Sequence, residues 1–214
     1  KDPAKVEALL AGKIPIFEPG LDELVANNVA AGRLRFSLES GEAVSGADAV
    51  FIAVGTPSRR GDGHADLSYV YAAAKEMAEY LRPGSVVVTK STVPVGTGDE
   101  VERIIREARP DFEFSVASNP EFLREGAAIE DFKRPDRIVI GVDDEHARLV
   151  LQEVYRPLIR NESPLLVMAR RAAELTKYAA NAFLATKISF INEIADLCEK
   201  VGADVQDVAK GIGM

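Results

Sequence analysis

The sequence predicts an α/β fold: a doubly wound, parallel sheet followed by a long helix. Short apolar runs such as Ala49–Val54 and Ser85–Thr89 end in turn residues, which is typical of parallel strands covered on both faces. These runs alternate with segments whose apolar residues recur at helical spacing. The last helical segment, from about Arg170 to Val201, is far longer than the others and ends at Gly202.

Each expected element is bounded by glycine, proline or a change in hydrophobic period. Gly12, Gly32 and the pair Pro83-Gly84 end three of the helices. The expected strands, in order, are 34–38, 49–54, 85–89, 112–117, 137–141 and 165–168. The expected helices are 4–11, 21–31, a weak turn at 43–47, 67–81, 99–108, 145–159, 170–201 and 204–210. The one domain boundary that we place lies between residues 168 and 169.

Composition excludes several classes of function. The chain has 214 residues, 47% of them hydrophobic, and a net charge of -8 with interspersed signs, so we expect no nucleic-acid partner. No apolar run approaches the length of a membrane span, so we expect no membrane partner. The single cysteine, Cys198, excludes an internal disulfide and favours a reducing compartment, the cytoplasm. It is expected to be a small buried residue without chemistry.

The most informative motif is Ser118-Asn119-Pro120-Glu121-Phe122-Leu123-Arg124-Glu125-Gly126. It follows the apolar run 114–117, and Asn-Pro is a turn signal, so Glu121 and Glu125 are expected just past the carboxyl end of a strand. That edge is where open α/β sheets bind ligands. The alternative is that both carboxylates begin a helix, where the helix dipole favours them.

Two further loops leave neighbouring strands. Val54-Gly55-Thr56-Pro57-Ser58 offers a glycine that allows close approach of a ligand, together with hydroxyls and amides for a phosphate or ribose. Ser91-Thr92-Val93-Pro94 follows the next strand, and neighbouring parallel strands present their exit loops to one crevice. Two ordinary turns rich in Ser and Thr are the alternative.

Lys177 and Asn181 are four residues apart on the long helix and share a face, which continues through Leu184 and Ile188. A lysine on a face that otherwise points to the core is costly unless it is paired. The pair therefore either lines a ligand pocket or meets a buried carboxylate that fixes the helix. No metal site is expected, because neither histidine has a partner at metal-ligand spacing.

Several linked segments resemble one family. FIAVGTPS, KSTVPVGT, SNPEFLREG, RPDRIVIG and ELTKYAANAFLATKISFINEIADLCEKVGAD, in this order, are similar to segments of the UDP-glucose 6-dehydrogenase family, as is the opening DPAKVEALLAGKIPIFEPGLDEL. The resemblance covers essentially the whole chain. The family oxidises UDP-glucose to UDP-glucuronate in two NAD-dependent steps. Relatives that act on GDP-mannose share PEFLRE, but the long helix favours UDP-glucose.

The resemblance implies roles for individual residues. Glu121 would be the general acid or base, and Lys177 and Asn181 would stabilise the oxyanion, assisted by Thr92. Lys5 would approach the NAD ribose. The residues implied to line the cofactor are Val54, Gly55, Thr56, Pro57, Ser58, Ser91, Thr92, Val93 and Glu125. Those implied to hold the sugar nucleotide are Glu121, Phe122, Leu123, Arg124, Glu125, Lys177 and Asn181.

By the same resemblance, residues 1–168 would be a Rossmann-like NAD-binding domain without its first βαβ unit, and 169–214 the start of a helical dimerisation domain. The family's glycine-rich fingerprint and nucleophilic cysteine are absent from these residues, and Cys198 lies in the wrong element. We therefore expect an internal fragment that is inactive alone, from a homodimer joined through the long helix. The alternatives are a dehydrogenase of GDP-mannose or a UDP-N-acetylhexosamine, and a non-catalytic dimerisation module.

Overall fold

A computed structural model describes residues 2–61, 63–159 and 164–213. The chain divides into two compact units, Lys1–Glu174 and Leu175–Met214. The first contains a five-stranded sheet and the helices packed on it, and the second contains most of the long helix and a short helix after it.

The sheet confirms the predicted fold class. Its strands, β1 (Ala49–Ile52), β2 (Ser85–Thr89), β3 (Phe114–Ser118), β4 (Ile138–Gly141) and β5 (Leu165–Met168), lie in the order β1-β2-β3-β4-β5. β1, β2 and β3 are parallel neighbours, and β4 pairs with β5 in parallel. The prediction of a parallel sheet fails at one junction, where β3 and β4 are antiparallel through the pair Ser118 and Gly141.

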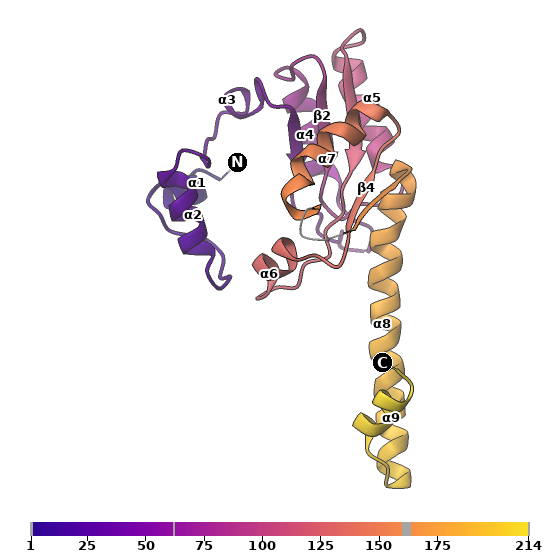
Figure 1. Ribbon diagram of the computed structural model, residues 1–214. Helices are drawn as coiled ribbons and strands as arrows, with labels where there is room; N and C mark the ends of the chain where they lie inside the picture. The colour runs from indigo at the N-terminus through magenta and orange to yellow at the C-terminus, as the bar shows by residue number, and fades with distance from the viewer. Residues whose placement is uncertain (1, 62, 160–163, 214) are drawn as a thin grey trace. The chain divides into compact units, whose positions relative to one another are not determined.

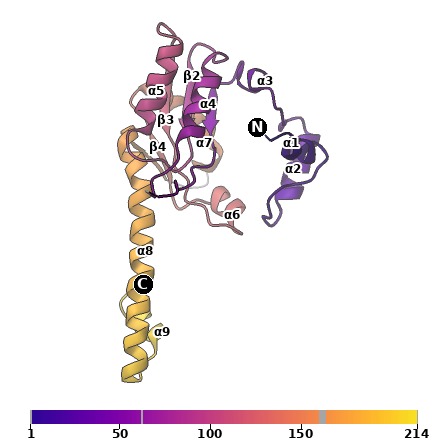
Figure 2. The same cartoon turned by 180° about the vertical axis from the view of Figure 1, so that it is seen from behind.

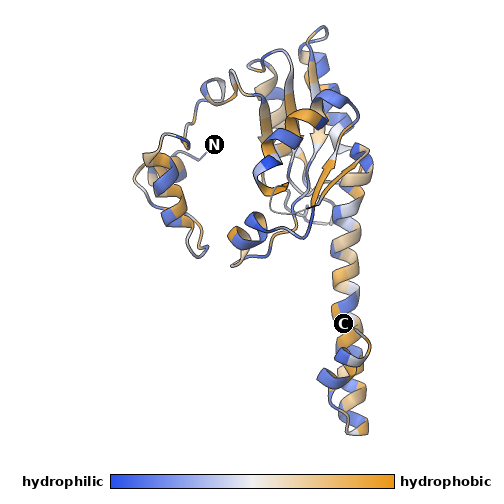
Figure 3. Cartoon of the chain, in the orientation of Figure 1, coloured by the Kyte–Doolittle hydropathy of each residue, from blue (hydrophilic) through white to orange (hydrophobic). Residues whose placement is uncertain are grey.

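Helices cover both faces of this sheet. α4 (Ser68–Ala78) and α5 (Thr97–Ala108) share a buried cluster with Val87 and Val116, whereas α7 (Glu145–Ile159) packs with Val86 and Val88. Successive strand residues point to opposite faces, so β2 is buried along its whole length. Figures 1 and 2 show α7 on one side of the strands and α4 and α5 on the other, and Figure 3 shows the strands mainly in the hydrophobic colours.

The chain has further helices besides these three, and Val44 on one of them joins the buried cluster of α4 and α5. They are α1 (Pro3–Leu10), α2 (Leu21–Ala30), α3 (Ser40–Val44), α6 (Ala128–Lys133), α8 (Arg170–Val201) and α9 (Val205–Gly211). Asp2 caps α1 through Oδ1, which accepts from the Lys5 amide at 3.3 Å, and Pro3 occupies the first turn. Neither α1 nor α2 contributes a fully buried residue.

Some predicted elements differ from the structure. The strand predicted at 34–38 is wrong, because the described residues include no strand that pairs with this segment, and an extended segment needs a neighbour for its backbone groups. The weak turn predicted at 43–47 is α3, which begins earlier at Ser40. The first sheet strand ends at Ile52 rather than Val54, and β3 covers Phe114–Ser118 instead of 112–117.

The first turns of α8 are bound closely to the sheet and to α5. Arg170 is 6% exposed and its guanidinium pairs with Asp99 at 2.7 Å and with Glu102 at 2.9 Å. Glu174 is 2% exposed and accepts from the amides of Gly96 at 2.6 Å and Gly98 at 2.7 Å. Because these amides lie at the start of α5, the Glu174 carboxylate occupies the position that the helix dipole favours.

Two glycines make this close approach possible. A Cβ at Gly141 would lie 2.6 Å from the Cβ of Ala173 and 2.8 Å from the Cα of Arg170. A Cβ at Gly98 would lie 2.6 Å from Cδ of Arg170. The contact at Gly141 includes backbone, which cannot rotate away as a flexible side chain can.

Substitution Gly141→Ala should therefore lower the free energy of unfolding by about 1–3 kcal/mol, the usual cost of overpacking a rigid contact. Urea or thermal unfolding of the purified protein measures this. Gly55→Ala is the matched control, because a Cβ there meets nothing within 4 Å. Equal stability of the two variants would contradict the close contact.

Candidate functional site

The exit loops of β1 and β2 lie side by side at the carboxyl edge of the sheet. The Thr56 hydroxyl donates to the Thr92 carbonyl at 2.9 Å, and the Ser91 hydroxyl donates to the Val54 carbonyl at 2.6 Å. Thr56, Ser91 and Thr92 are half-buried. The two hydroxyl-bearing loops that the sequence identified are thus joined directly, since each donates one side-chain hydroxyl to a backbone carbonyl of the other.

Within these loops the residues differ in what they could offer a ligand. Gly55 is exposed, and the space where its Cβ would stand is open to 4 Å, so its backbone can be approached closely. Pro57 and Ser58 are also exposed, and Ser58 forms an isolated bridge with Ala65. Val93 is 3% exposed and packs in the core beneath α4 and α5, so only its backbone could contact a ligand.

The third exit loop carries Glu121. β3 ends at Ser118 and α6 begins only at Ala128, so Glu121 lies in an irregular loop past the strand end. The predicted location is confirmed, and the alternative that Glu121 and Glu125 begin a helix is wrong. The half-buried Glu121 accepts at Oε2 from the amide of Leu123 at 2.7 Å.

The rest of this loop is held by charged and aromatic contacts. The Arg137 guanidinium lies 4.4 Å above the ring of Phe122. Arg124 donates from Nη2 to Oδ1 of Asp131 at 2.7 Å and from Nε to Oδ2 at 3.0 Å. The hydrogen bonds from the Arg124 side chain lower the pKa of Asp131 to about 2. Glu125 is exposed.

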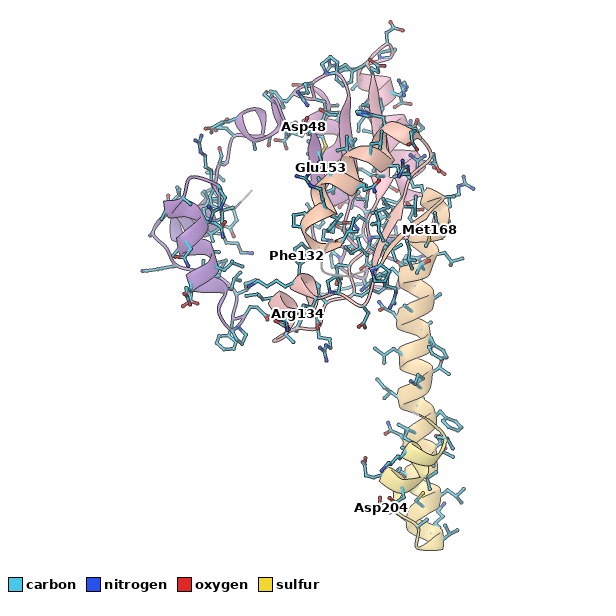
Figure 4. All side chains as sticks on the ribbon, viewed as in Figure 1. Asp48, Phe132, Arg134, Glu153, Met168 and Asp204 are labelled. Atoms are coloured by element: carbon cyan, nitrogen blue, oxygen red, sulfur yellow. The ribbon has the colours of Figure 1, made fainter. Side chains whose placement is uncertain are left out.

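A cavity of about 510 Å³ adjoins the loop. Its lining mixes cations, carboxylates and aromatic rings, and Figure 4 labels two lining residues at α6, Phe132 and Arg134. The lining comprises Lys90, Asn119, Pro120, Glu121, Phe122, Leu123, Arg124, Glu130, Asp131, Phe132, Arg134, Pro135, Asp136, Arg137, Ile138, Tyr155 and Leu158. Such a mixture suits a polar ligand with both apolar and anionic parts.

Sequence reasoning gave no side-chain role to three polar residues that are bonded to one another where this loop begins. The side-chain oxygen of Asn119 accepts from the Lys90 ammonium at 3.2 Å and from the Tyr155 hydroxyl. Lys90 could have been noticed as a charge directly after the buried strand Ser85–Thr89. Tyr155 continues the buried stripe of Ala147 and Leu151 at four-residue spacing, which places a polar group on a core face.

Sequence reasoning also missed Glu18, which holds the other end of the loop. Its carboxylate accepts from the amide of Gly126 at 2.9 Å and from the amide of Ala128 at 2.8 Å. Lys5, by contrast, is exposed on α1, and none of the hydrogen bonds or ion pairs of the described residues joins its side chain to the three loops.

The second unit contains Lys177 and Asn181. Lys177 is 8% exposed, whereas Asn181 is exposed. The expectation that their stripe continues onto a core face is wrong for this chain, since Leu184 is 58% exposed and Ile188 is 53% exposed. Cys198 is a free, buried cysteine, as predicted.

Comparison with known proteins decides the family. Residues 1–159 match the NAD binding domain of the UDP-glucose/GDP-mannose dehydrogenase family, and residues 171–214 match the central domain of the same family. The chain belongs to the UDP-glucose/GDP-mannose dehydrogenase family. The cofactor expected from the sequence, NAD, is the one for which the matched domain of this family is described.

Similar members of this family include two curated UDP-glucose 6-dehydrogenases. That of Rhizobium meliloti is 72% identical over 100% of this chain and 49% of the relative, and that of Pseudomonas aeruginosa is 50% identical over 100% of this chain and 48% of the relative. The chain thus spans about half the length of these relatives.

Solved structures from the family have the same fold. A UDP-glucose dehydrogenase from Pyrobaculum islandicum aligns with a TM-score of 0.92 at 49% identity, over 100% of this chain and 49% of the other. A GDP-mannose dehydrogenase from Pseudomonas aeruginosa aligns with a TM-score of 0.92 at 35% identity, over 99% of this chain and 49% of the other.

Two properties of the described residues bear on the membrane and metal sites that the sequence leads us not to expect. No helix in the part of the chain described by the structure has the length and apolar character needed to cross a membrane. Among residues 2–61, 63–159 and 164–213, no three His, Cys, Asp or Glu side chains are grouped as metal ligands.

The contact between Arg124 and Asp131 leads to a pH-dependent prediction. Because the folded-state pKa of Asp131 lies below its ordinary 3.8, the pair contributes stability above pH 3.8 that is lost as pH falls through about 2. Arg124→Gln should move the Asp131 titration midpoint up toward 3.8, which carboxyl-carbon NMR measures. Arg134→Gln, which removes the partner of Glu130, should leave the Asp131 midpoint in place. A low midpoint that persists in Arg124→Gln would show that another group causes the shift.

Proposed function

We propose that the protein to which this chain belongs oxidises UDP-glucose to UDP-glucuronate in two successive NAD-dependent hydride transfers. The observation that carries the proposal is the 72% identity to a UDP-glucose 6-dehydrogenase across 100% of this chain. Identity to a GDP-mannose dehydrogenase is 35%, and identity to a UDP-D-ManNAc dehydrogenase is 25%, which disfavours the two alternative sugar nucleotides.

The exit loops of β1 and β2 fit the cofactor that we propose. The open backbone at Gly55 and the neighbouring hydroxyl residues lie at the carboxyl edge of the sheet, where α/β folds bind dinucleotides. We assign cofactor binding to Val54, Gly55, Thr56, Pro57, Ser58, Ser91, Thr92 and Val93, with Lys5 and Glu125 as further contacts. When bound, NAD supplies the hydride acceptor.

We assign the proton transfers of the reaction to the carboxylate of Glu121. A carboxylate can accept the proton of the sugar hydroxyl as the carbonyl forms, and can later take a proton from water. The half-buried location of Glu121 past the end of β3, with Oε2 bonded to the Leu123 amide, supports this assignment.

Lys177 and Asn181 are assigned to stabilise negative charge on oxygen. An ammonium does this best where water is excluded, and Lys177 is 8% exposed. Asn181 adds an amide donor one turn further along α8. Thr92 would assist through its hydroxyl, on the loop beside Thr56.

Phe122, Leu123, Arg124 and Glu125 are assigned to hold the sugar nucleotide. They belong to the loop that borders the 510 Å³ cavity, except that Glu125 is not among its lining residues. The mixture of ring, guanidinium and backbone amides suits a nucleotide with an anionic diphosphate.

The long helix is proposed to join two copies of the protein, which would function in the cytoplasm. Apolar residues at seven-residue spacing, Phe183, Phe190 and Leu197, are 67%, 48% and 53% exposed and form a stripe along α8. An apolar stripe of this kind on a helix is typically covered by a partner.

Full-length protein should reduce NAD when given UDP-glucose, and more slowly or not at all with GDP-mannose or UDP-N-acetylmannosamine. Lys177→Ala should lower kcat by about 10²-fold or more, the usual effect of losing an oxyanion donor, with little change in the Kd for NAD. Initial rates of NADH formation and NAD titrations measure both. An equal loss of turnover and NAD affinity would contradict the oxyanion role, and preference for another sugar nucleotide would contradict the proposed substrate.

Sedimentation should find full-length protein as a dimer, and Phe190→Lys should shift it toward monomer, since a lysine in an apolar interface is strongly disfavoured. Glu199→Lys is the control, because nine residues at 100° each place it on the opposite side of α8. Dissociation by both variants, or by neither, would contradict pairing through this stripe.

A further inference from the structure

Asn119 is bonded to three neighbouring elements at the point where the chain turns toward Glu121. Its amide N–H donates to the Thr89 carbonyl at 2.9 Å, which extends the ladder between β2 and β3. Its side-chain Nδ2 donates to the Val139 carbonyl on β4 at 2.9 Å. Its Oδ1 accepts from Lys90 at 3.2 Å and from the hydroxyl of Tyr155 on α7.

The chemistry of the partners fixes the orientation of the Asn119 amide. An ammonium can only donate, so Lys90 must face the oxygen, and a carbonyl can only accept, so Val139 must face the NH₂ group. The Tyr155 hydroxyl then donates to the same oxygen. Burial raises the pKa of Tyr155 to about 12, so the phenol keeps the proton that it donates.

Burial makes these bonds costly to lose. Asn119 is 2% exposed and Tyr155 is 5% exposed, so water cannot readily replace a missing partner. A buried polar group left without its hydrogen bond destabilises the folded state, because it has lost water without gaining a partner. The Asn119 side chain is therefore restrained from three directions at once.

This restraint is passed on to Glu121 over a short distance along the chain. Pro120 fixes its own φ and restricts the backbone of Asn119, so little freedom separates the anchored residue from Glu121. On the C-terminal side of Glu121, its Oε2 accepts from the Leu123 amide at 2.7 Å. Lys90 and Tyr155 line the same cavity as Glu121.

We propose that Asn119 is a positioning residue for Glu121, and that the hydroxyl of Tyr155 and the ammonium of Lys90 act through it. They hold the turn after β3 so that the Glu121 carboxylate is presented in one orientation. The assignment of Glu121 as the proton-transfer residue rests on the proposed function, but the restraint on the turn does not. The two can therefore be tested separately.

The test without catalysis uses Tyr155→Phe, which removes one hydroxyl and keeps the ring. In full-length protein the Leu123 amide should exchange with solvent roughly fivefold faster or more, since loss of about 1 kcal/mol of restraint lowers its protection. Tyr71→Phe, on the opposite face of the sheet, should leave that amide unchanged. Unchanged exchange at Leu123 in Tyr155→Phe would overturn the positioning role whatever the substrate of the enzyme is.

The test with catalysis is a double-mutant cycle on the sugar nucleotide that the wild type oxidises fastest. Tyr155→Phe should lower kcat roughly fivefold to tenfold, with KM for NAD unchanged. In a Glu121→Gln background the same change should have little further effect, because the group that it positions is already lost. If Tyr155→Phe lowers kcat by the same factor in the wild type and in the Glu121→Gln background, the effect is general destabilisation and the proposal is overturned.

Lys90→Met serves as a second variant if Tyr155→Phe does not fold, and the same non-additivity with Glu121→Gln is expected of it. If the wild type oxidises no sugar nucleotide, the proposed function fails, while hydrogen exchange at Leu123 still decides whether Asn119 positions the loop.

Discussion

The charged cluster around Arg170 and Glu174 is the interaction on which the arrangement of the first unit depends. Arg170 also bonds to the Val116 carbonyl at 3.2 Å, and its Nε lies 3.3 Å from Asp143 as an ion pair without hydrogen-bond geometry. Burial raises the pKa of Glu174, although the amides of Gly96 and Gly98 favour its charged form. Removing one partner of such a cluster typically costs about 3–5 kcal/mol, because a buried charge is left uncompensated. The cluster is therefore a strong constraint on geometry even where its net contribution to stability is small.

The sheet explains why the polar residues gather where they do. β1, β2 and β3 run in the same direction, so the chain leaves all three at one edge. Their interiors contain apolar residues that face two helical layers, whereas the exit loops contain hydroxyls, carboxylates and Lys90. The strands, covered by helices on both faces, form a rigid support, and the loops contain the polar groups that can bind or react with a ligand. The bonds from Thr56 to Thr92 and from Ser91 to Val54 tie two of the loops to each other.

The sequence predicted most of this fold because hydrophobic period and turn residues act locally. β2, α7 and β5 have the predicted bounds, and Glu121 lies past a strand end as expected. The strand at 34–38 failed because pairing depends on a neighbour, which a local pattern cannot reveal. Likewise, Glu18, Asn119 and Tyr155 meet their partners across 108, 20 and 36 residues of sequence, so spacing gave no signal for those contacts.

The loop that carries Glu121 is held at both ends by contacts that the sequence pattern did not predict. Asn119 fixes its start through the core, and Glu18 binds the Gly126 and Ala128 amides at its end. Between these anchors, Arg124 is tied to Asp131, and Phe122 lies beneath Arg137. A loop restrained in this way loses less conformational entropy when it orders around a ligand. Glu121 is half-buried whereas Glu125 is exposed, and this difference supports the proposal that Glu121 transfers the proton.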